Sequence, residues 1–224
     1  MYYEGLSLGA IRRKLEQDYN SCPSDSTIYE WVNRFTVLAV NEARDCHPQV
    51  GDRWVLHNSS IKIGGKKYWL IDVFDTSTRF LLASRLSGNR NLEDVKQLME
   101  AAREKARKIP QKLIINVIHE WAGYLSGIEM AYGADSKQIE MILSRNAAMA
   151  KELERWRVIL KERNSIIQSL KDKDTAELIL SGWVVHYNYF RPHEMLSGKT
   201  PAKKAGISYN IGLSRKLPVI HGVK

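Results

Sequence analysis

The sequence predicts an α/β protein in which a mixed sheet with flanking helices follows a small helical module. Three observations support this fold class. Apolar residues recur at helical spacing up to about residue 41, apolar strand-like stretches around a Gly-Gly turn begin at residue 53, and amphipathic stretches cover 91–108 and 146–170. With 224 residues, the chain can form one main domain and one appendage.

Residues 1–41 are expected to form a helix-turn-helix that binds DNA. A first helix begins after Ser7, and a polar turn at 20–26 precedes a second helix over 27–35, where Thr27 and Glu30 fit a capping box. In this motif the second helix enters the DNA groove. Its residues directed at the groove would be Ser26, Tyr29, Asn33 and Arg34. The alternative is a helical hairpin that only packs.

Residues 42–52 are polar, contain Pro48 and Gly51, and are interpreted as a linker to the main domain at 53–207. That domain opens with strands at 54–63 and 68–84, joined by a hairpin turn at 64–67, and the segment from Arg79 adds a third antiparallel strand. A helix over 91–108, an isoleucine-rich strand over 112–118, a long helix over 146–170 and a helix over 175–189 follow. Residues 208–224 form a basic tail.

The charge of the chain favours a polyanionic partner such as nucleic acid. The net charge is +9, and residues 195–224 hold six basic and no acidic side chains, whereas residues 1–41 hold four basic and five acidic ones. No apolar run approaches the ~20 residues of a membrane span, and the N-terminus has no secretory pattern, so a cytoplasmic protein is expected. Cys22 and Cys46 have no metal-binding or redox spacing.

The segment 186–202, HYNYFRPHEMLSGKTPA, resembles the C-terminal signature of bacterial and archaeal insertion-sequence transposases. The strands around Trp54 and Tyr68 and the step at 160–163 resemble the same family, so the likeness covers residues 5–207. These are the DDE transposases, similar in fold to retroviral integrases. The resemblance implies a ribonuclease H-like domain, a role in DNA transposition, and double-stranded transposon ends as the partner. It also implies a homo-oligomer or a hetero-oligomer with an intact transposase.

The resemblance further implies two acids on neighbouring strands and a glutamate on a later helix, which together hold two Mg²⁺ ions. Mg²⁺ is a hard cation that prefers oxygen ligands, and two ions ~4 Å apart stabilise both the attacking and the leaving oxygen of a phosphoryl displacement. A neutral imidazole supplies neither the charge nor the hard donor. The identity of these three residues therefore decides whether the chemistry is available.

Histidine occupies two of the three acidic positions. His57-Asn58-Ser59 stands where the family has Asp-Glu-Thr, and His119-Glu120 stands where it has Asp-Gly. Glu154 matches the third acid, within the family's Glu-Arg pair. The preferred interpretation is a pseudoenzyme that folds and binds DNA, binds no Mg²⁺ tightly and does not cut, because losing two ligands removes metal binding.

Alternative interpretations remain open. Activity is retained if Glu120 or Asp72 replaces the lost ligands, although Asp72 also fits a structural position at a strand end. In another alternative, His57, His119 and Glu154 form a two-histidine, one-carboxylate site suited to Zn²⁺, Mn²⁺ or Fe²⁺. The alternative from a different class is a pure DNA-binding module that represses or partners an intact transposase.

Basic residues elsewhere offer phosphate contacts. Arg191 and His193 resemble family residues beside the active site, although Arg191 also fits a helix-capping role. Lys199 belongs to the stretch without acids and is a third candidate for DNA contact. Four charged residues of the long helix are expected on its solvent flank: Arg155, Arg157, Lys161 and Arg163. Family members carry more residues before the helix-turn-helix, so this module is expected to be N-terminally truncated.

Overall fold

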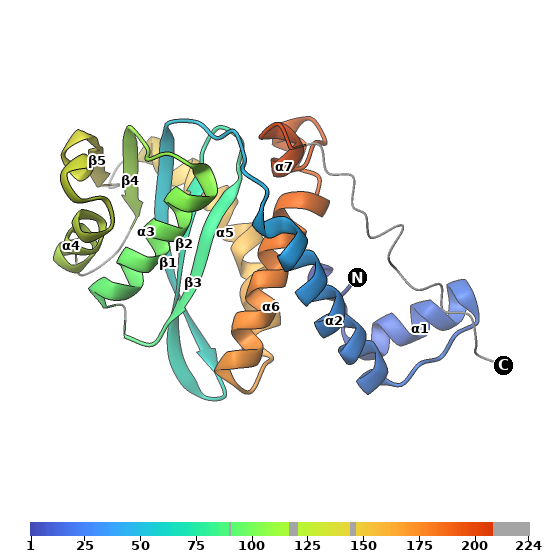
Figure 1. Ribbon diagram of the computed structural model, residues 1–224. Coiled ribbons are helices and arrows are strands. Elements are labelled where there is room, and N and C mark those ends of the chain that lie inside the picture. The colour runs from blue at the N-terminus through green and yellow to red at the C-terminus, as the bar shows by residue number, and fades with distance from the viewer. Residues whose placement is uncertain (90, 117–120, 144–146, 208–224) are drawn as a thin grey trace.

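A computed structural model describes residues 1–89, 91–116, 121–143 and 147–207 and shows one mixed, five-stranded sheet (Figure 1). The strand order is β3-β2-β1-β4-β5, in which β1, β2 and β3 pair antiparallel and β4 and β5 run parallel to β1. The strands are β1 (Arg53–Ile63), β2 (Lys66–Asp75), β3 (Leu81–Ser87), β4 (Lys112–Asn116) and β5 (Glu140–Leu143). The expected mixed sheet is therefore present.

The hairpin between β1 and β2 closes through Gly64 and Gly65 alone. Their φ angles are +54° and +82°, the left-handed backbone that a two-residue turn between twisted strands requires and that glycine adopts without steric cost. A Cβ on Gly64 would also lie 2.3 Å from the carbonyl oxygen of Lys171. The turn was predicted at 64–67. Its position is correct, but the turn contains only two residues, because β2 begins at Lys66 and not at residue 68.

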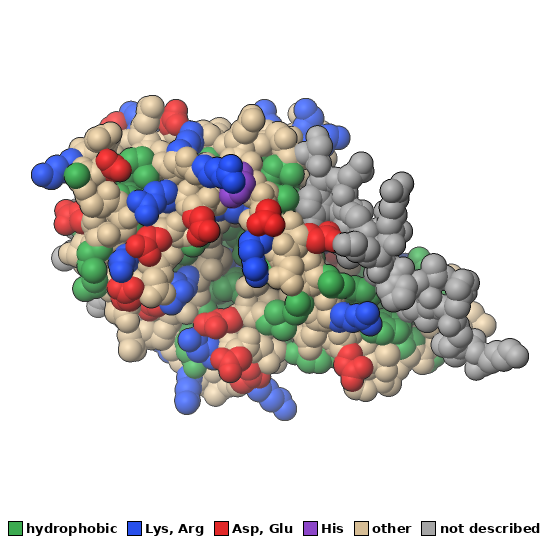
Figure 2. Space-filling view, viewed as in Figure 1, with side chains coloured by type: hydrophobic (Ala, Val, Ile, Leu, Met, Phe, Trp, Pro, Cys, Tyr) green, Lys and Arg blue, Asp and Glu red, His purple; other side chains and the backbone are tan. Residues whose placement is uncertain are grey.

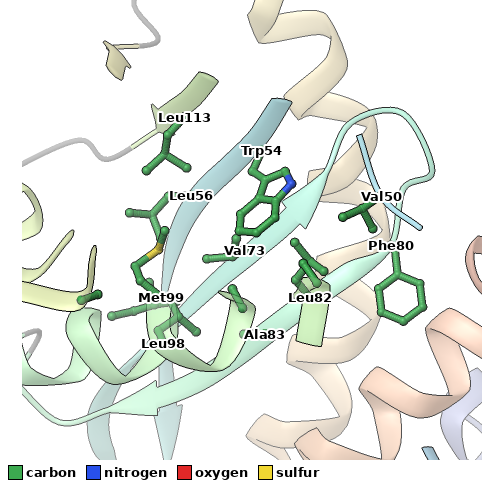
Figure 3. Close-up of a cluster of buried hydrophobic side chains, with 14 of the residues drawn as sticks. Val50, Trp54, Leu56, Val73, Phe80, Leu82, Ala83, Leu98, Met99 and Leu113 are labelled. Carbon is green, nitrogen blue, oxygen red and sulfur yellow. The ribbon is translucent and has the colours of Figure 1, made fainter. Parts of the chain in front are cut away.

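Helices cover both faces of the sheet because the residues of β1 alternate between two apolar environments. Trp54 and Leu56 belong to a core that includes residues of α3 (Leu92–Ala106) and α4 (Trp121–Tyr132), and Figure 3 shows part of this core. Val55 belongs to the opposite core, with residues of α5 (Ala147–Gln168) and α6 (Lys173–Val185). A helix–sheet–helix sandwich follows.

The N-terminal helices, α1 (Leu8–Tyr19) and α2 (Asp25–Arg44), follow a short turn of 3-10 helix at Tyr2–Glu4. The N-cap of α2 is Ser24, whose Oγ accepts a hydrogen bond from the amide of Thr27 at 3.1 Å, so the predicted capping box at Thr27 was wrong. The helix also runs far beyond residue 35 because its second half packs along α6 and buries Thr36 and Ala43. Residues 42–44, expected in a linker, are helical.

The chain after α6 continues as a π-helix and leaves the helical conformation only at Arg191. The winding changes to a π-turn over His186–Phe190, and the backbone becomes extended at Arg191, as Pro192 requires. The described chain ends with a 3-10 turn, η4 (Glu194–Leu196), and α7 (Pro201–Lys204), which is capped by Thr200. Another 3-10 segment, η2 (Gly133–Gln138), joins α4 to β5. Among the described helices, none is long and apolar enough to span a bilayer.

Candidate active site

A row of polar residues crosses the sheet on the face that α5 covers. In register, His57 of β1 lies opposite Asp72 of β2, and Asp72 lies opposite Ser84 of β3. Directly paired residues of neighbouring strands share a face of the sheet. The next row on that face is apolar and contains Val55, Phe74, Leu81 and Ile114. The polar row is therefore a distinct feature of the sheet, and it contains the position of the first expected acid.

Asp72 is held by Arg163, which reaches down from α5. The guanidinium donates from Nη1 to Oδ1 at 2.6 Å and from Nη2 to Oδ2 at 3.0 Å, and the hydroxyl of Ser84 donates to Oδ1 at 2.5 Å. Both charged side chains are fully buried. Because Arg163 binds both carboxylate oxygens, the geometry supports the structural interpretation of Asp72 and argues against its use as a substitute metal ligand.

The expected position of Arg163 on the solvent flank of the long helix was wrong. Trp156, Leu160, Arg163 and Ile167 lie four, three and four residues apart, so they share one helical stripe, and all four are buried. The sequence-based expectation assigned the charge to solvent because its partner, Asp72, is 91 residues away. Lys161, by contrast, is exposed as expected.

His57 is buried, with 8% of its surface exposed, and lies in this polar row. Its neighbour Asn58 points to the other face, where its side-chain amide donates to the hydroxyl of Tyr124 in α4 at 2.7 Å. Glu154 lies in α5, two residues before the buried Trp156, but its side chain is outside the described part of the structure. His119 and Glu120 lie outside the described residues altogether. A site built from His57, His119 and Glu154 therefore stays a prediction.

The described donors do not fit a paired Mg²⁺ site. His57 offers an imidazole, and the carboxylate beside it, Asp72, is bound to Arg163. Two closely spaced Mg²⁺ ions need several carboxylate oxygens to balance their charge. Within the described ranges, no group of three or more His, Cys, Asp or Glu side chains is arranged to hold a metal.

A pocket of about 590 Å³ lies between α5 and the segment that follows the π-turn. It is lined by Arg79, Val158, Ile159, Arg191, Pro192, His193, Glu194 and Met195. This pocket, called here the Arg79 pocket, contains both Arg191 and His193, two of the residues expected to contact phosphate. Arg191 forms an ion pair with Glu162 of α5.

Arg79 contributes a buried positive charge to this pocket. Only 5% of the residue is exposed, and its guanidinium carbon lies 5.9 Å from the centre of the Trp156 ring. No carboxylate of the described residues lies within ion-pairing distance of it. Burying a charge without a paired partner costs several kcal/mol. Its backbone is held by the hydroxyl of Tyr187, which donates to the Arg79 carbonyl at 3.0 Å.

His193 lies against the same pocket and is neutral at physiological pH. Burial, followed by the charges of Arg191 and Arg79, lowers its pKa to about 4. Its ring stands edge-on to Tyr187 with centroids 4.9 Å apart, and its buried Nε2 has no hydrogen-bond partner among the described residues. A buried polar atom without a partner is uncommon in proteins and marks a site that a ligand can satisfy.

The other residues expected to contact DNA are dispersed. Ser26 and Arg34 are exposed on α2, whereas Tyr29 is half-buried, and Asn33 is half-buried with its Oδ1 covered by protein. Lys199 is exposed, and its carbonyl accepts a hydrogen bond from the amide of His193 at 3.1 Å. Arg79 was not among the site residues predicted from the sequence. The signal in the sequence that could have identified it is its place directly before the apolar run Phe80–Ala83, where an arginine adjoins a buried strand.

Comparisons with known proteins bear on the fold. Neither a protein-family model nor a curated protein matches this sequence. The HTLV-2 integrase catalytic core domain, solved with magnesium in a trimeric form, superposes with a TM-score of 0.52 at 16% identity and covers 71% of this chain and 99% of its own. A chain of the simian T-cell lymphotropic virus intasome, solved with the PP2A regulatory subunit B56 gamma, gives a TM-score of 0.54 at 16% identity. That match covers 80% of this chain and 60% of the intasome chain.

At such low identity these likenesses show the fold alone. The sheet order and the flanking helices are those of an integrase catalytic core, and the predicted ribonuclease H-like fold class is confirmed.

Proposed function

We propose that this chain is a transposase-type DNA-binding protein whose strand-transfer chemistry is disabled. One observation carries the proposal: an integrase-type sheet has a buried histidine, His57, at the β1 position where the resemblance expects the first metal-binding acid. The rest of the scaffold is well formed, with the Asp72–Arg163 pair buried beside this position. A protein that keeps this folded core but has histidine in place of a metal-binding acid is expected to bind DNA without cleaving it.

Duplex DNA of transposon ends is the partner that the charge supports best. Basic and acidic side chains are interspersed on the face shown in Figure 2. Because the stretch 195–224 has six basic and no acidic side chains, we assign phosphate contact to the basic tail at 208–224, and we assign groove contact to the exposed side of α2 as the helix-turn-helix predicts. Within α2, Ser26 and Arg34 are exposed in positions that a DNA groove can reach. In this role the chain binds DNA alone or in an oligomer with an intact transposase.

Titration of a labelled duplex at two salt concentrations tests DNA binding. Log affinity is expected to fall linearly with log salt, because phosphate contacts release counterions. Arg34→Gln is expected to weaken binding to all sequences and to reduce the salt slope by about one. Lys137→Gln is the matched control, since Lys137 is also exposed but lies in η2, directly before the edge strand β5 and outside α2. An affinity that does not change with salt would contradict the proposal.

A nicking assay on inverted-repeat DNA tests the chemistry. With Mg²⁺ present, no cleavage is expected, because a single retained acid cannot hold two ions. Cleavage that disappears in Glu154→Gln would show instead that substitute ligands support activity.

A further inference from the structure

The Arg79 pocket contains an unbalanced positive charge that the rest of the fold does not explain. Two arginines of the described chain are buried, and they differ in one respect. Arg163 is bound by the carboxylate of Asp72, whereas Arg79 faces the aromatic ring of Trp156 and the pocket. The acid nearest to Arg79 in sequence, Asp75, forms no ion pair with it among the described contacts: its Oδ2 accepts hydrogen bonds from the Thr78 amide at 2.7 Å and the Thr78 hydroxyl at 2.6 Å, and its Oδ1 is buried without a hydrogen-bond partner.

The polar groups of the pocket match an anion. Arg79 and Arg191 are charged donors, and the buried Nε2 of His193 has no hydrogen-bond partner in the described structure. Guanidinium groups bind phosphate oxygens through short, charge-assisted hydrogen bonds. Glu194 is also in the lining, but it is exposed, and Glu162 is already paired with Arg191.

The size and the apolar wall of the pocket indicate more than a bare anion. Its volume of about 590 Å³ exceeds what a phosphate group fills, and Val158, Ile159 and Met195 offer apolar surface beside the charges. A nucleotide combines the two features, because its phosphate is anionic and its base is flat and largely apolar on its faces.

We propose that the Arg79 pocket binds a phosphate group of a DNA strand, held by Arg79, Arg191 and His193, with the attached sugar and base against Val158 and Ile159. This inference rests on the proposed DNA-binding function and assigns one strand contact to a defined pocket. It adds Arg79, a residue that no sequence motif identified, to the DNA-binding set.

Phosphate binding in this pocket is coupled to the protonation of His193. In the empty pocket, burial and the two arginines keep the imidazole neutral. A bound phosphate offsets the charges of Arg79 and Arg191 and accepts a hydrogen bond from Nε2, so it raises the pKa of His193. The other titratable groups around the ring are Tyr187, whose pKa is raised well above its ordinary value by burial, the exposed Glu194, and Glu162 at Arg191.

The test follows the ring signals of His193 by NMR in the full chain, assigned with His193→Gln. Inorganic phosphate and a 5′-phosphorylated thymidine dinucleotide are the probes. Both are expected to shift the His193 signals saturably and to raise the pKa of that ring. The dinucleotide is expected to bind more tightly than phosphate, because only it covers the apolar wall.

Val158→Glu places a carboxylate in the pocket from an exposed helix position and does not disturb the core. It is expected to weaken binding of both probes by about tenfold, through repulsion and competition for the arginines. Met130→Glu is the matched control, since Met130 is exposed on α4, outside the pocket and away from α2, and it should leave dinucleotide binding unchanged. Arg191→Gln serves as a second variant and should also weaken binding of both probes.

Two results would overturn the inference: His193 signals that neither probe moves, or equal effects of Val158→Glu and Met130→Glu. Duplex binding measured in parallel separates this inference from the proposed function. A chain that binds duplex while His193 stays unmoved refutes the pocket and keeps the function. A chain that binds the dinucleotide at His193 but no duplex refutes the DNA-binding function.

Discussion

The buried ion pair between Asp72 and Arg163 fixes α5 to the middle of the sheet. The pair joins β2 to the helix that carries Glu154, and Ser84 of β3 completes the carboxylate's hydrogen bonds. Such a pair adds little net stability compared with apolar residues of the same size, but removing one partner leaves a buried charge. The pair therefore acts mainly on the position of α5 relative to β1 and His57.

Arg163→Met is expected to destabilise the protein by about 3–5 kcal/mol, because Asp72 remains buried without a partner. Adding Asp72→Val should recover part of this loss, so that the double variant is more stable than the sum of the single effects predicts. Urea unfolding measures these free energies. Lys161→Met, at an exposed position of the same helix, is the control and should change stability by less than about 0.5 kcal/mol. An effect of Arg163→Met as small as the control would contradict the role assigned to the pair.

His193 makes stability depend on pH. Its folded-state pKa of about 4 lies below the ordinary value of 6.5, so the unfolded chain binds more protons between these values. Its contribution is fully present above about pH 6.5 and is lost as the pH falls toward 4, by up to about 3 kcal/mol. Unfolding of wild type and His193→Gln at pH 7.5 and 4.5 measures the effect. The variant should lose less stability on acidification, and an equal loss in both proteins would contradict the prediction.

The contact between α2 and α6 joins the N-terminal helices to the helical layer that covers one face of the sheet. It is built on Gly182 of α6, where an added Cβ would lie 2.0 Å from the Tyr3 hydroxyl and 2.7 Å from a methyl carbon of Thr36. The hydroxyls of Tyr3 and Thr36 hydrogen-bond to each other beside this glycine. Burial raises the pKa of Tyr3 to about 12, so its hydroxyl stays protonated at physiological pH.

Gly182→Ala is therefore expected to destabilise the protein by about 1–2 kcal/mol, although alanine favours helices over glycine by up to about 1 kcal/mol. Gly123→Ala in α4 is the matched control, because no heavy atom of the described structure beyond its chain neighbours and its own helix backbone lies within 4 Å of the added Cβ. The control should be neutral or slightly stabilising. Thermal unfolding of both variants tests the difference. Equal unfolding midpoints would show that the close approach of Tyr3 and Thr36 to Gly182 does not contribute to stability.

The sequence predicted those elements whose signals are local. Alternation and the Gly64-Gly65 turn identify β1 and β2, and the apolar stripe of α3 ends with Arg107 in the left-handed region. No element was predicted for 121–143, where α4, η2 and β5 occur. The strand β5 has only four residues and depends on pairing with β4, which is a contact distant in sequence. The length of α2 likewise depends on α6.

The candidate site was predictable only as a set of sequence positions. Strand register confirms that His57 lies beside Asp72 on the face under α5, but the buried partner of Arg163 and the uncompensated charge of Arg79 both depend on residues far away in the chain. Local periodicity assigns charged residues to solvent unless such partners are known. The division at residue 41 into two modules stays a prediction, since α2 continues to Arg44 and packs on α6.

At the scale of the whole molecule, the structure combines an integrase-type scaffold with a histidine, His57, at the position where the sequence resemblance expects the first acid. The integrase-type sheet, its two layers of helices and the buried Asp72–Arg163 pair are all present, whereas the described donors around His57 do not fit a pair of Mg²⁺ ions. The central claim is that loss of function is confined to the ligands. If so, restoring the ligands restores metal binding without any other change.

Calorimetric titration with Mn²⁺ of wild type, His57→Asp, His119→Asp and the double variant tests this claim most directly. Each single variant should bind little, because two carboxylates are too few for a paired-ion site. The double variant should bind more tightly than the sum of the single effects predicts, as coupled neighbouring sites do. A double variant that binds Mn²⁺ no better than wild type would contradict the account, because the scaffold would then no longer bring the strands and Glu154 together.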